Sequence, residues 1–110
     1  MSKLIDKNVE KILENCPLYS NVDNDNLIAV VKFFNPFGLG TWYVVEAEKQ
    51  LNGDYLFYGY VESPITPEFN EFGYFTLFEL ESVGIIERDI YFEPTPLKEL
   101  LHDNNGSFKE

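Results

Sequence analysis

Residues 41–62, TWYVVEAEKQLNGDYLFYGYVE, decide the fold of this chain. Their first part, 41–48, alternates apolar and polar side chains, as a strand with two different faces does. The pair Asn52-Gly53 follows and favours a tight turn, because both positions tolerate positive φ. We therefore predict that 55–62 folds back as the antiparallel partner of 41–48.

The two faces of the first strand are expected to carry different side chains. Glu46 and Glu48 fall on one face. The other face is apolar and holds Tyr43, Val45 and Ala47. In the second strand, Gly59 has no side chain and leaves a gap that a facing aromatic ring or a β-bulge could occupy.

The segment after the hairpin is expected to contain a loop, a strand and a helix. Residues 63–72 include two prolines and no clean periodicity, which predicts a loop over one edge of the sheet. A short strand is expected at 73–76. Thr76 with Glu79 three residues later has the pattern of a capping box, which predicts a helix to about Ser82.

The end of the chain predicts an outer strand and a final helix. RDIYFE at 88–93 alternates again. Thr95-Pro96 places a capping residue before a proline at the first helical position, so PLKELLH is expected to be a short helix. Residues 104–110 are expected to form a flexible tail.

Upstream of the hairpin, the sequence predicts a helix, a strand and a turn. Residues 3–14 carry apolar side chains at helical spacing, with Ser2 as the expected N-cap and Pro17 beyond the end. LIAVVKFF at 27–34 is apolar except for its lysine, which predicts a central strand. NPFGLG at 35–40 is typical of a turn.

These elements together predict an α+β fold. We expect a small antiparallel sheet of about four to five strands, an N-terminal helix, and short helices after the sheet. A length of 110 residues leaves room for one core, and 45% of the residues are hydrophobic. A single domain over residues 1–103 is therefore expected.

The cysteine content and the hydropathy pattern indicate the cellular compartment in which the protein is expected. Cys16 is the only cysteine, so it cannot form an internal disulfide, and a packing role is expected for it. Charged residues interrupt the apolar positions at the N-terminus, and no stretch approaches the roughly 20 apolar residues of a membrane span. We expect a soluble, cytoplasmic protein that does not bind membranes.

A net charge of −11 is the unusual feature of the composition. Residues 46–93 contain eleven acidic and only two basic residues. A field of this sign repels nucleic acid, so direct binding of nucleic acid is not expected. The acidity could serve solubility alone, or an acidic face could bind a basic, nucleic-acid-binding surface of a protein partner.

Motifs for catalysis and cofactor binding are mostly missing from the sequence. His102, the only histidine, lies in the final predicted helix without a nucleophile at a recognised spacing. Neither a glycine-rich phosphate-binding loop nor an EF-hand is present, so we expect no cofactor, no metal site and no catalytic residue. The aromatic strands could stack bases, yet the cationic groove that accompanies stacking is lacking, so their rings are interpreted as core.

Several ordered blocks of sequence resemble a known family. The blocks are KFFNP at 32–36, TWYVVE at 41–46, GYV at 59–61, GYFTLFELESV at 73–83 and IERDIYFEPTPLKEL at 86–100. Over about residues 10–101 they resemble the domain of unknown function 2958, a family of small proteins carried on plasmids, conjugative elements and phages. The resemblance implies that some relatives act as anti-CRISPR inhibitors of Cas9-type nucleases.

The resemblance and the charge suggest one function. It is a non-catalytic acidic protein of a mobile genetic element that inhibits a host defence nuclease, with a type II-A Cas9-like enzyme as the expected target. Surface carboxylates are expected to act as phosphate-like charges against the basic channel of that enzyme. The candidate partner-binding residues are Glu46, Glu48, Glu62, Glu68, Glu71, Glu79 and Glu81.

Two other classes of function stay open. The chain could be an accessory protein of conjugation or of a plasmid. It could also bind a small ligand, or be a carboxylate-based enzyme, with a pocket between the aromatic sheet and residues 63–72. Arg88 and Asp89 stand out in the IERD block, and they are interpreted as a structural motif, an internal ion pair that braces the last strand, with partner binding as the alternative.

Overall fold

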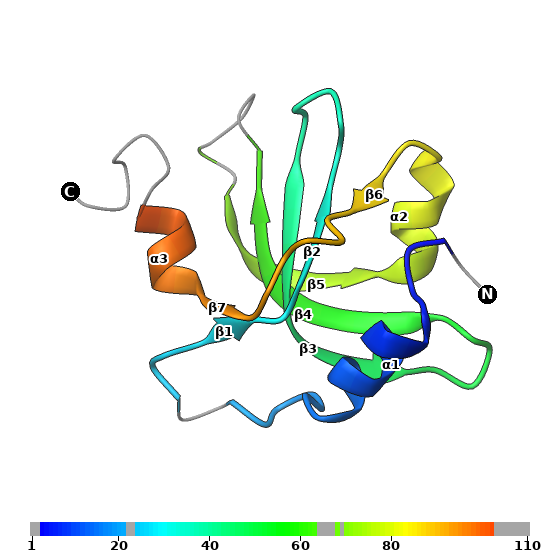
Figure 1. Cartoon of the computed structure of the whole chain (residues 1–110), viewed down its shortest axis with the longest axis horizontal. Coiled ribbons are helices and arrows are strands. Elements are labelled where there is room, and N and C mark those ends of the chain that lie inside the picture. Colours follow the sequence, from blue (N-terminus) through cyan, green and yellow to red (C-terminus); the bar gives the residue numbers. More distant parts are fainter. Residues whose placement is uncertain (1–2, 22–23, 64–67, 69, 103–110) are drawn as a thin grey trace.

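The structure is a computed structural model, and it describes residues 3–21, 24–63, 68 and 70–102. Three helices and seven strands lie within these ranges (Figure 1). In chain order they are α1 Lys7–Glu14, β1 Ile28–Ala29, β2 Val31–Phe34, β3 Thr41–Lys49, β4 Tyr55–Glu62, β5 Glu71–Thr76, α2 Leu77–Val83, β6 Glu87–Arg88, β7 Thr95–Pro96 and α3 Leu97–His102. The predicted α+β fold is confirmed.

The main sheet has five antiparallel strands in the order β5-β4-β3-β2-β6, and β1 and β7 form a separate two-stranded pair. The predicted hairpin consists of β3 and β4, which are the two longest strands and lie inside the five-stranded sheet. Figure 1 shows α1 and α2 on one side of the sheet and α3 on the other.

The turn of the hairpin lies at the predicted place but is not the expected two-residue type. Gln50 donates its N–H to the carbonyl of Asp54 at 2.8 Å, so the loop is longer than Asn52-Gly53 alone. Gly53 has a φ of 90°, whereas Asn52 is not in the left-handed region. Asp54 also ties the turn to α2, because its Oδ1 accepts the N–H of Phe78 at 2.9 Å.

A β-bulge in β3 corrects the predicted alternation of its side chains. The register with β4 shifts between Val44 and Glu46. Because one extra residue enters β3 there, Val44 and Ala47 face the main core, while Tyr43 and Val45 face the opposite side of the sheet. The grouping of Ala47 with Tyr43 and Val45 was therefore wrong.

Gly59 explains how the bulge fits against β4. A Cβ built on Gly59 would lie 2.9 Å from the carbonyl carbon of Tyr43 and 3.1 Å from the Cα of Val44. Its neighbours are thus the backbone of β3, with no aromatic ring among the closest atoms. Of the two predicted uses of this glycine, the bulge is the one that the structure contains.

The main core fills the face of the sheet toward α1 and α2. Phe57 lies at its centre, with its ring centroid 5.6 Å from that of Phe33 and 5.4 Å from that of Phe75. Val9 and Leu13 are the buried residues of α1. A second, smaller cluster packs on the opposite face, under α3. Its buried members are Ala29, Tyr43, Val45, Leu97 and Leu101.

The N-terminal region differs from the prediction at two points. Helix α1 begins at Lys7 rather than at residue 3, because the side chain of Asp6 accepts the N–H of Val9 at 2.9 Å and caps the helix there. The expected cap, Ser2, lies outside the described residues. The run 27–34 is split at Val30, so that β1 pairs with β7 while β2 enters the main sheet.

The region after the hairpin contains one confirmed element and several shifted ones. Helix α2 has the predicted capping box between Thr76 and Glu79. Strand β5 begins at Glu71, two residues before the prediction. The predicted strand 88–93 is wrong: β6 ends at Arg88, and a turn follows it, in which Asp89 accepts the N–H of Tyr91 at 3.0 Å.

The C-terminal helix is present with a shifted start. Thr95 and Pro96 pair with β1 as β7, and helix α3 begins one residue later, at Leu97. The predicted tail, 104–110, lies outside the described residues, as do 64–67 and 69 of the predicted loop 63–72. The last two residues of that predicted loop belong to β5 instead.

Candidate binding site

Glu46, expected to be a surface carboxylate, is buried. It is only 5% exposed. Its Oε1 accepts the backbone N–H of Tyr19 at 2.8 Å, and its Oε2 accepts that of Asn21 at 2.9 Å. Glu46 is therefore not the surface carboxylate that was expected, because the bulge and the 19–21 segment cover most of its side chain.

The other predicted carboxylates differ in solvent exposure and in hydrogen bonding. Five of the six are exposed, namely Glu48, Glu68, Glu71, Glu79 and Glu81. The side chain of Glu79 accepts the backbone N–H of Thr76 at 2.9 Å and so serves the cap of α2. Glu62 is half-buried, and burial raises the pKa of its carboxyl, an effect that Lys32 opposes.

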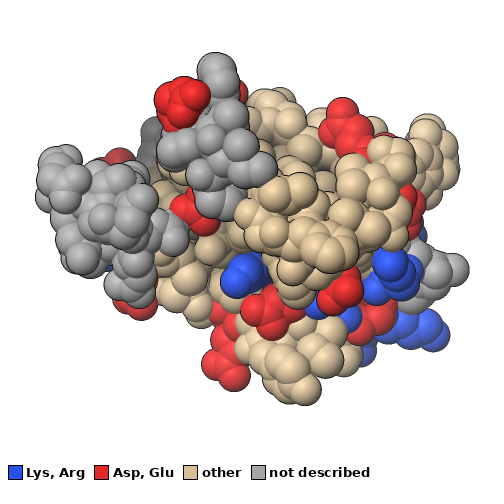
Figure 2. All heavy atoms as spheres, turned by 90° about the horizontal axis from the view of Figure 1, so that it is seen from above, with Lys and Arg blue, Asp and Glu red and all other residues tan. Residues whose placement is uncertain are grey.

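These carboxylates do not form one acidic face. Glu71 pairs with Val61 and Glu48 with Leu56, five residues apart along β4, which corresponds to roughly 16 Å. Acidic side chains in the view of Figure 2 are scattered among uncharged atoms, and most of the basic side chains in view lie toward the lower right. The structure thus spreads the predicted set over both ends of the sheet and α2.

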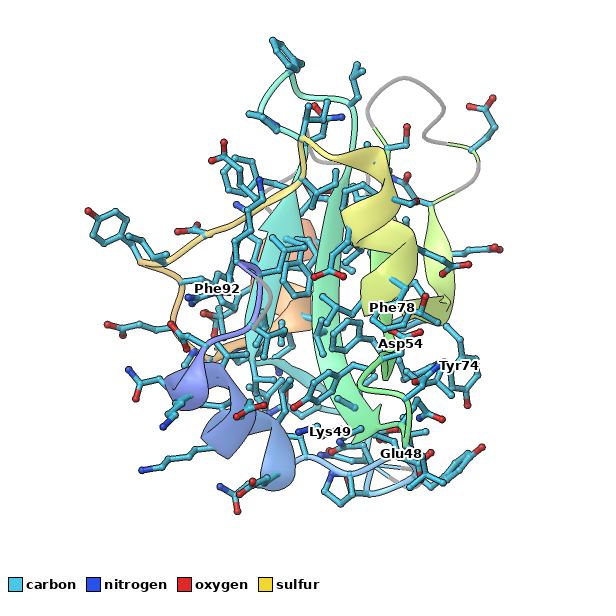
Figure 3. All side chains as sticks on the ribbon, turned by 90° about the vertical axis from the view of Figure 1, so that its right-hand side faces the viewer. Glu48, Lys49, Asp54, Tyr74, Phe78 and Phe92 are labelled. Atoms are coloured by element: carbon cyan, nitrogen blue, oxygen red, sulfur yellow. The ribbon has the colours of Figure 1, made fainter. Side chains whose placement is uncertain are left out.

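A row of three side chains crosses the sheet on the face opposite the main core. Glu46 of β3 is the register partner of Tyr58 of β4, and Tyr58 is that of Tyr74 of β5. The rings of Tyr58 and Tyr74 lie 5.1 Å apart at 55°. Phe72 continues the aromatic surface, with its centroid 5.0 Å from that of Tyr60. Figure 3 shows Tyr74 on the far side of the sheet from α1.

This row forms one wall of a hollow of about 300 Å³, which we call the aromatic hollow. The other wall comes from the segment between α1 and β1. The lining residues are Tyr19, Asn21, Asn24, Leu27, Glu46, Tyr58 and Tyr74. The small-ligand alternative placed a pocket beside 63–72; among the described residues, this hollow is bounded instead by the earlier segment.

The backbone of Tyr19 is strained in a way that shapes the hollow. Its φ of 70° is the only positive value of a non-glycine residue in the described ranges. A tyrosine pays a steric cost in this left-handed region. The hydrogen bond from its N–H to Glu46 helps to hold this conformation, while the side chain stays 68% exposed.

The tyrosine hydroxyls of the hollow interact with each other. A hydrogen bond with the Tyr19 side chain is the main reason that the pKa of Tyr74 is raised, and burial adds to it. Among the described lining residues of the hollow, Glu46 is the one that carries a carboxyl group. Sequence reasoning missed these tyrosines because it assigned the aromatic strands to the core; alternation of Tyr58 and Tyr60 was the signal that they share the other face.

Comparison with known proteins now identifies the family. The profile of the family described as a protein of unknown function, DUF2958, matches residues 4–102. The chain belongs to the DUF2958 family. The predicted resemblance is confirmed, over a slightly longer range than the expected residues 10–101. No curated protein and no solved structure matches the chain significantly.

Arg88 and Asp89 of this DUF2958 protein contact other segments of the chain. The guanidinium of Arg88 lies 2.8 Å from the carboxylate of Asp6, at the start of α1. Asp89 lies 3.8 Å from the ammonium of Lys32 in β2 and donates its N–H to the Lys32 carbonyl. The two residues therefore do not pair with each other, and they tie the short strand β6 to α1 and β2.

Cys16 also has a structural contact in the DUF2958 chain. Its carbonyl accepts the N–H of Ala47 at 2.8 Å, and burial raises the pKa of its half-buried thiol. Within the described ranges, no three metal-ligating side chains cluster together. None of the helices described combines the length and the apolarity that crossing a membrane requires.

Proposed function

We propose that this DUF2958 protein is a non-catalytic binding protein of a mobile genetic element, whose partner presents a basic, nucleic-acid-binding surface. The specific form of the proposal is inhibition of a guide-loaded, Cas9-type nuclease. The observation that carries it is the aromatic hollow, which holds a carboxylate and whose described lining residues include no lysine or arginine. Such a site suits a cationic group supplied from outside.

The electrostatics of the remaining surface support the same proposal. The chain carries a net charge of −11. Three basic side chains already face carboxylates of the chain itself, in the pairs Lys32–Asp89, Lys49–Glu10 and Arg88–Asp6. The excess negative charge therefore remains to steer a basic partner, an effect that weakens as salt screens it.

The geometry of Glu46 favours binding over catalysis. Each of its oxygens accepts one backbone N–H, so the carboxylate has a structural role in holding the 19–21 segment and keeps one acceptor position on each oxygen for a ligand donor. A general acid or base must be free to exchange a proton with a substrate within hydrogen-bond distance. The lining residues that remain are amides, tyrosines and a leucine, which position and stack ligands.

A cleavage assay tests the proposal. The protein is titrated against a type II-A guide-loaded nuclease and, separately, a type I restriction enzyme, at two salt concentrations. We expect dose-dependent inhibition that weakens at the higher salt. A variant in which four exposed carboxylates are neutralised, Glu48→Gln, Glu68→Gln, Glu71→Gln and Glu81→Gln, should inhibit less.

The control has the same net charge but neutralises other exposed carboxylates, in the variant Glu14→Gln, Glu87→Gln, Glu93→Gln and Glu99→Gln. Equal loss in both variants would mean that net charge alone matters and would remove the surface assigned here. No inhibition of either enzyme at large excess would reject the nuclease form of the proposal. The favoured alternative would then be a plasmid-encoded conjugation partner.

A small-ligand role is the second candidate, and the size of the aromatic hollow favours it. Its volume of about 300 Å³ lies at the lower limit of small-molecule pockets. Retention of a metabolite by the protein purified under native conditions, detected by mass spectrometry, would support this role. Release of no compound by denaturation would count against it.

A further inference from the structure

We propose that the aromatic hollow is a receptor for the guanidinium group of an arginine side chain on the partner. The inference rests on the proposed function, because it names the group by which a basic partner is recognised. Three features of the hollow carry it: its unused acceptors, the arrangement of its rings, and the rigidity of the wall that holds them together.

Acceptors in the hollow exceed the donors that the chain supplies. A carboxylate offers about four acceptor positions. The Glu46 side chain uses two of them, for the N–H groups of Tyr19 and Asn21. The amide oxygens of Asn21 and Asn24 each accept one bond, at 3.1 and 2.8 Å, and each retains a second lone pair. A ligand with several N–H donors fits this set.

The rings of the hollow suit a flat cation. Tyr58 and Tyr74 are tilted by 55° with centroids 5.1 Å apart, so they do not cover each other face to face. Tyr19 stands on the opposite wall. The faces of aromatic rings are electron-rich and attract cations, and guanidinium groups stack on them more readily than ammonium groups do.

The wall that carries Tyr19 is fixed before any ligand arrives. Its left-handed φ of 70° is a conformation that a tyrosine rarely adopts, and the buried Glu46 holds it in place. Residues strained in this way concentrate at functional sites, where the surrounding structure holds them. A receptor that is already ordered loses less entropy when its ligand binds.

The charge and shape of the hollow select arginine over other groups. A phosphate would meet the Glu46 carboxylate without a compensating cation among the described lining residues. A lysine ammonium is compact and strongly hydrated, whereas a guanidinium presents five donors in a plane. The planar group can lie against a tyrosine face and direct its N–H groups at Glu46 and Asn21.

The test uses a small probe, N-acetyl-arginine methylamide, titrated into the full chain at low salt and followed by two-dimensional amide NMR. Citrulline methylamide, with the same N-acetyl group, is the matched control, because it has the shape of arginine without the charge. We expect chemical-shift changes that concentrate at the amides of residues 19–21, 58 and 74. The Kd of the arginine probe should be at least about fivefold lower than that of the citrulline probe. Equal affinity for citrulline would overturn the proposal.

Three variants distinguish a contact between the probe and the Tyr74 ring from a general effect of substitution on probe binding. Tyr74→Leu removes the ring and should abolish the preference for arginine over citrulline. Tyr74→Phe keeps the ring and should retain most of that preference. Tyr91→Leu removes an exposed tyrosine outside the hollow and should change nothing. An unchanged preference in Tyr74→Leu would refute the site, provided that the amide spectrum shows the same fold.

The outcomes also distinguish this inference from the proposed function. If the arginine probe fails to bind but inhibition depends on Glu48, Glu68, Glu71 and Glu81, the receptor is refuted and the basic-partner proposal stands. If the probe binds and Tyr74→Leu abolishes that binding while neither nuclease is inhibited, the receptor stands and the nuclease target is wrong.

Discussion

Substitution of Gly59 by alanine should disrupt the bulge that places Glu46 beneath the aromatic hollow. A Cβ there would lie 2.9 Å from the carbonyl carbon of Tyr43, and closer still to the oxygen of that carbonyl. These atoms belong to the backbone of β3 and cannot rotate away as a flexible side chain can. One of the two central strands must therefore shift.

The magnitude follows from the kind of atoms that collide. Overpacking a well-packed interior costs about 1–3 kcal/mol, and a backbone clash belongs at the upper end of that range. We expect Gly59→Ala to lower the free energy of unfolding by about 3 kcal/mol. For a domain of this size, the melting temperature should fall by roughly 12 °C or more.

Gly73 supplies the matched control, because it is the register partner of Gly59 on β5. A Cβ built on Gly73 meets nothing within 4 Å. Gly73→Ala should change the free energy of unfolding by less than about 0.5 kcal/mol. Urea denaturation of both variants measures the difference. Equal stability of the two would refute the assignment of Gly59 to a close backbone approach.

Three further predictions concern single interactions. Thr76→Ala should lower the free energy of unfolding by about 1 kcal/mol, because it removes the side-chain acceptor that caps α2, and Thr76→Ser should restore most of it in urea titrations. The Val9 N–H lowers the pKa of the Asp6 carboxyl below its ordinary value of 3.8, so Asp6 stabilises the fold above that pH, and the contribution disappears as the pH falls through the lowered pKa. The stability difference between the wild type and Asp6→Ala should therefore shrink below pH 3.8; a constant difference would contradict the assignment. Burial raises the pKa of Tyr43 from 10.0 to about 12, so its neutral form stabilises the fold fully below pH 10 and this contribution is lost as the pH rises toward 12. In ultraviolet titration, Tyr43→Phe should remove the tyrosine that ionises at about pH 12, and persistence of that step in the variant would contradict the prediction.

Features of the fold that depend on residues close together in the sequence could be predicted from it. The capping box of α2 needs only Thr76 and Glu79 at the correct spacing, and it is present. The hairpin of β3 and β4 needs two alternating segments around Asn52-Gly53. Such elements are specified within a few residues, so tertiary packing has little opportunity to change them.

Features that depend on distant contacts could not be predicted. The start of α1 is set by Asp6, whose carboxylate also meets Arg88 from the other end of the sequence. The run 27–34 divides because β7, about 65 residues later, pairs with β1. Apolar composition alone gave no sign of the change of partner at Val30.

The candidate site shows the same limit. Charge counting treated Glu46 as one exposed carboxylate among seven, but the bulge turns it toward the N–H groups of Tyr19 and Asn21. Neither the positive φ of Tyr19 nor its approach to Tyr74 follows from local sequence. Side-chain identity was thus sufficient to predict the charge of the surface but not which groups form the hollow.

The extra residue in β3 allows this strand to lose one residue without changing its register with β4. Loss of one codon, that of Val45, would restore regular pairing with β4 from Thr41 to Lys49. Glu46 would keep Tyr58 as its register partner on the face opposite the main core, and Val44 and Ala47 would stay in that core, so the second cluster would lose only the side chain of Val45. A substitution at the same position changes one side chain. Deletion of Val45 is therefore expected to destabilise the fold little more than its substitution does, whereas loss of a residue from the middle of β4, which carries no extra residue, would turn the rest of that strand over.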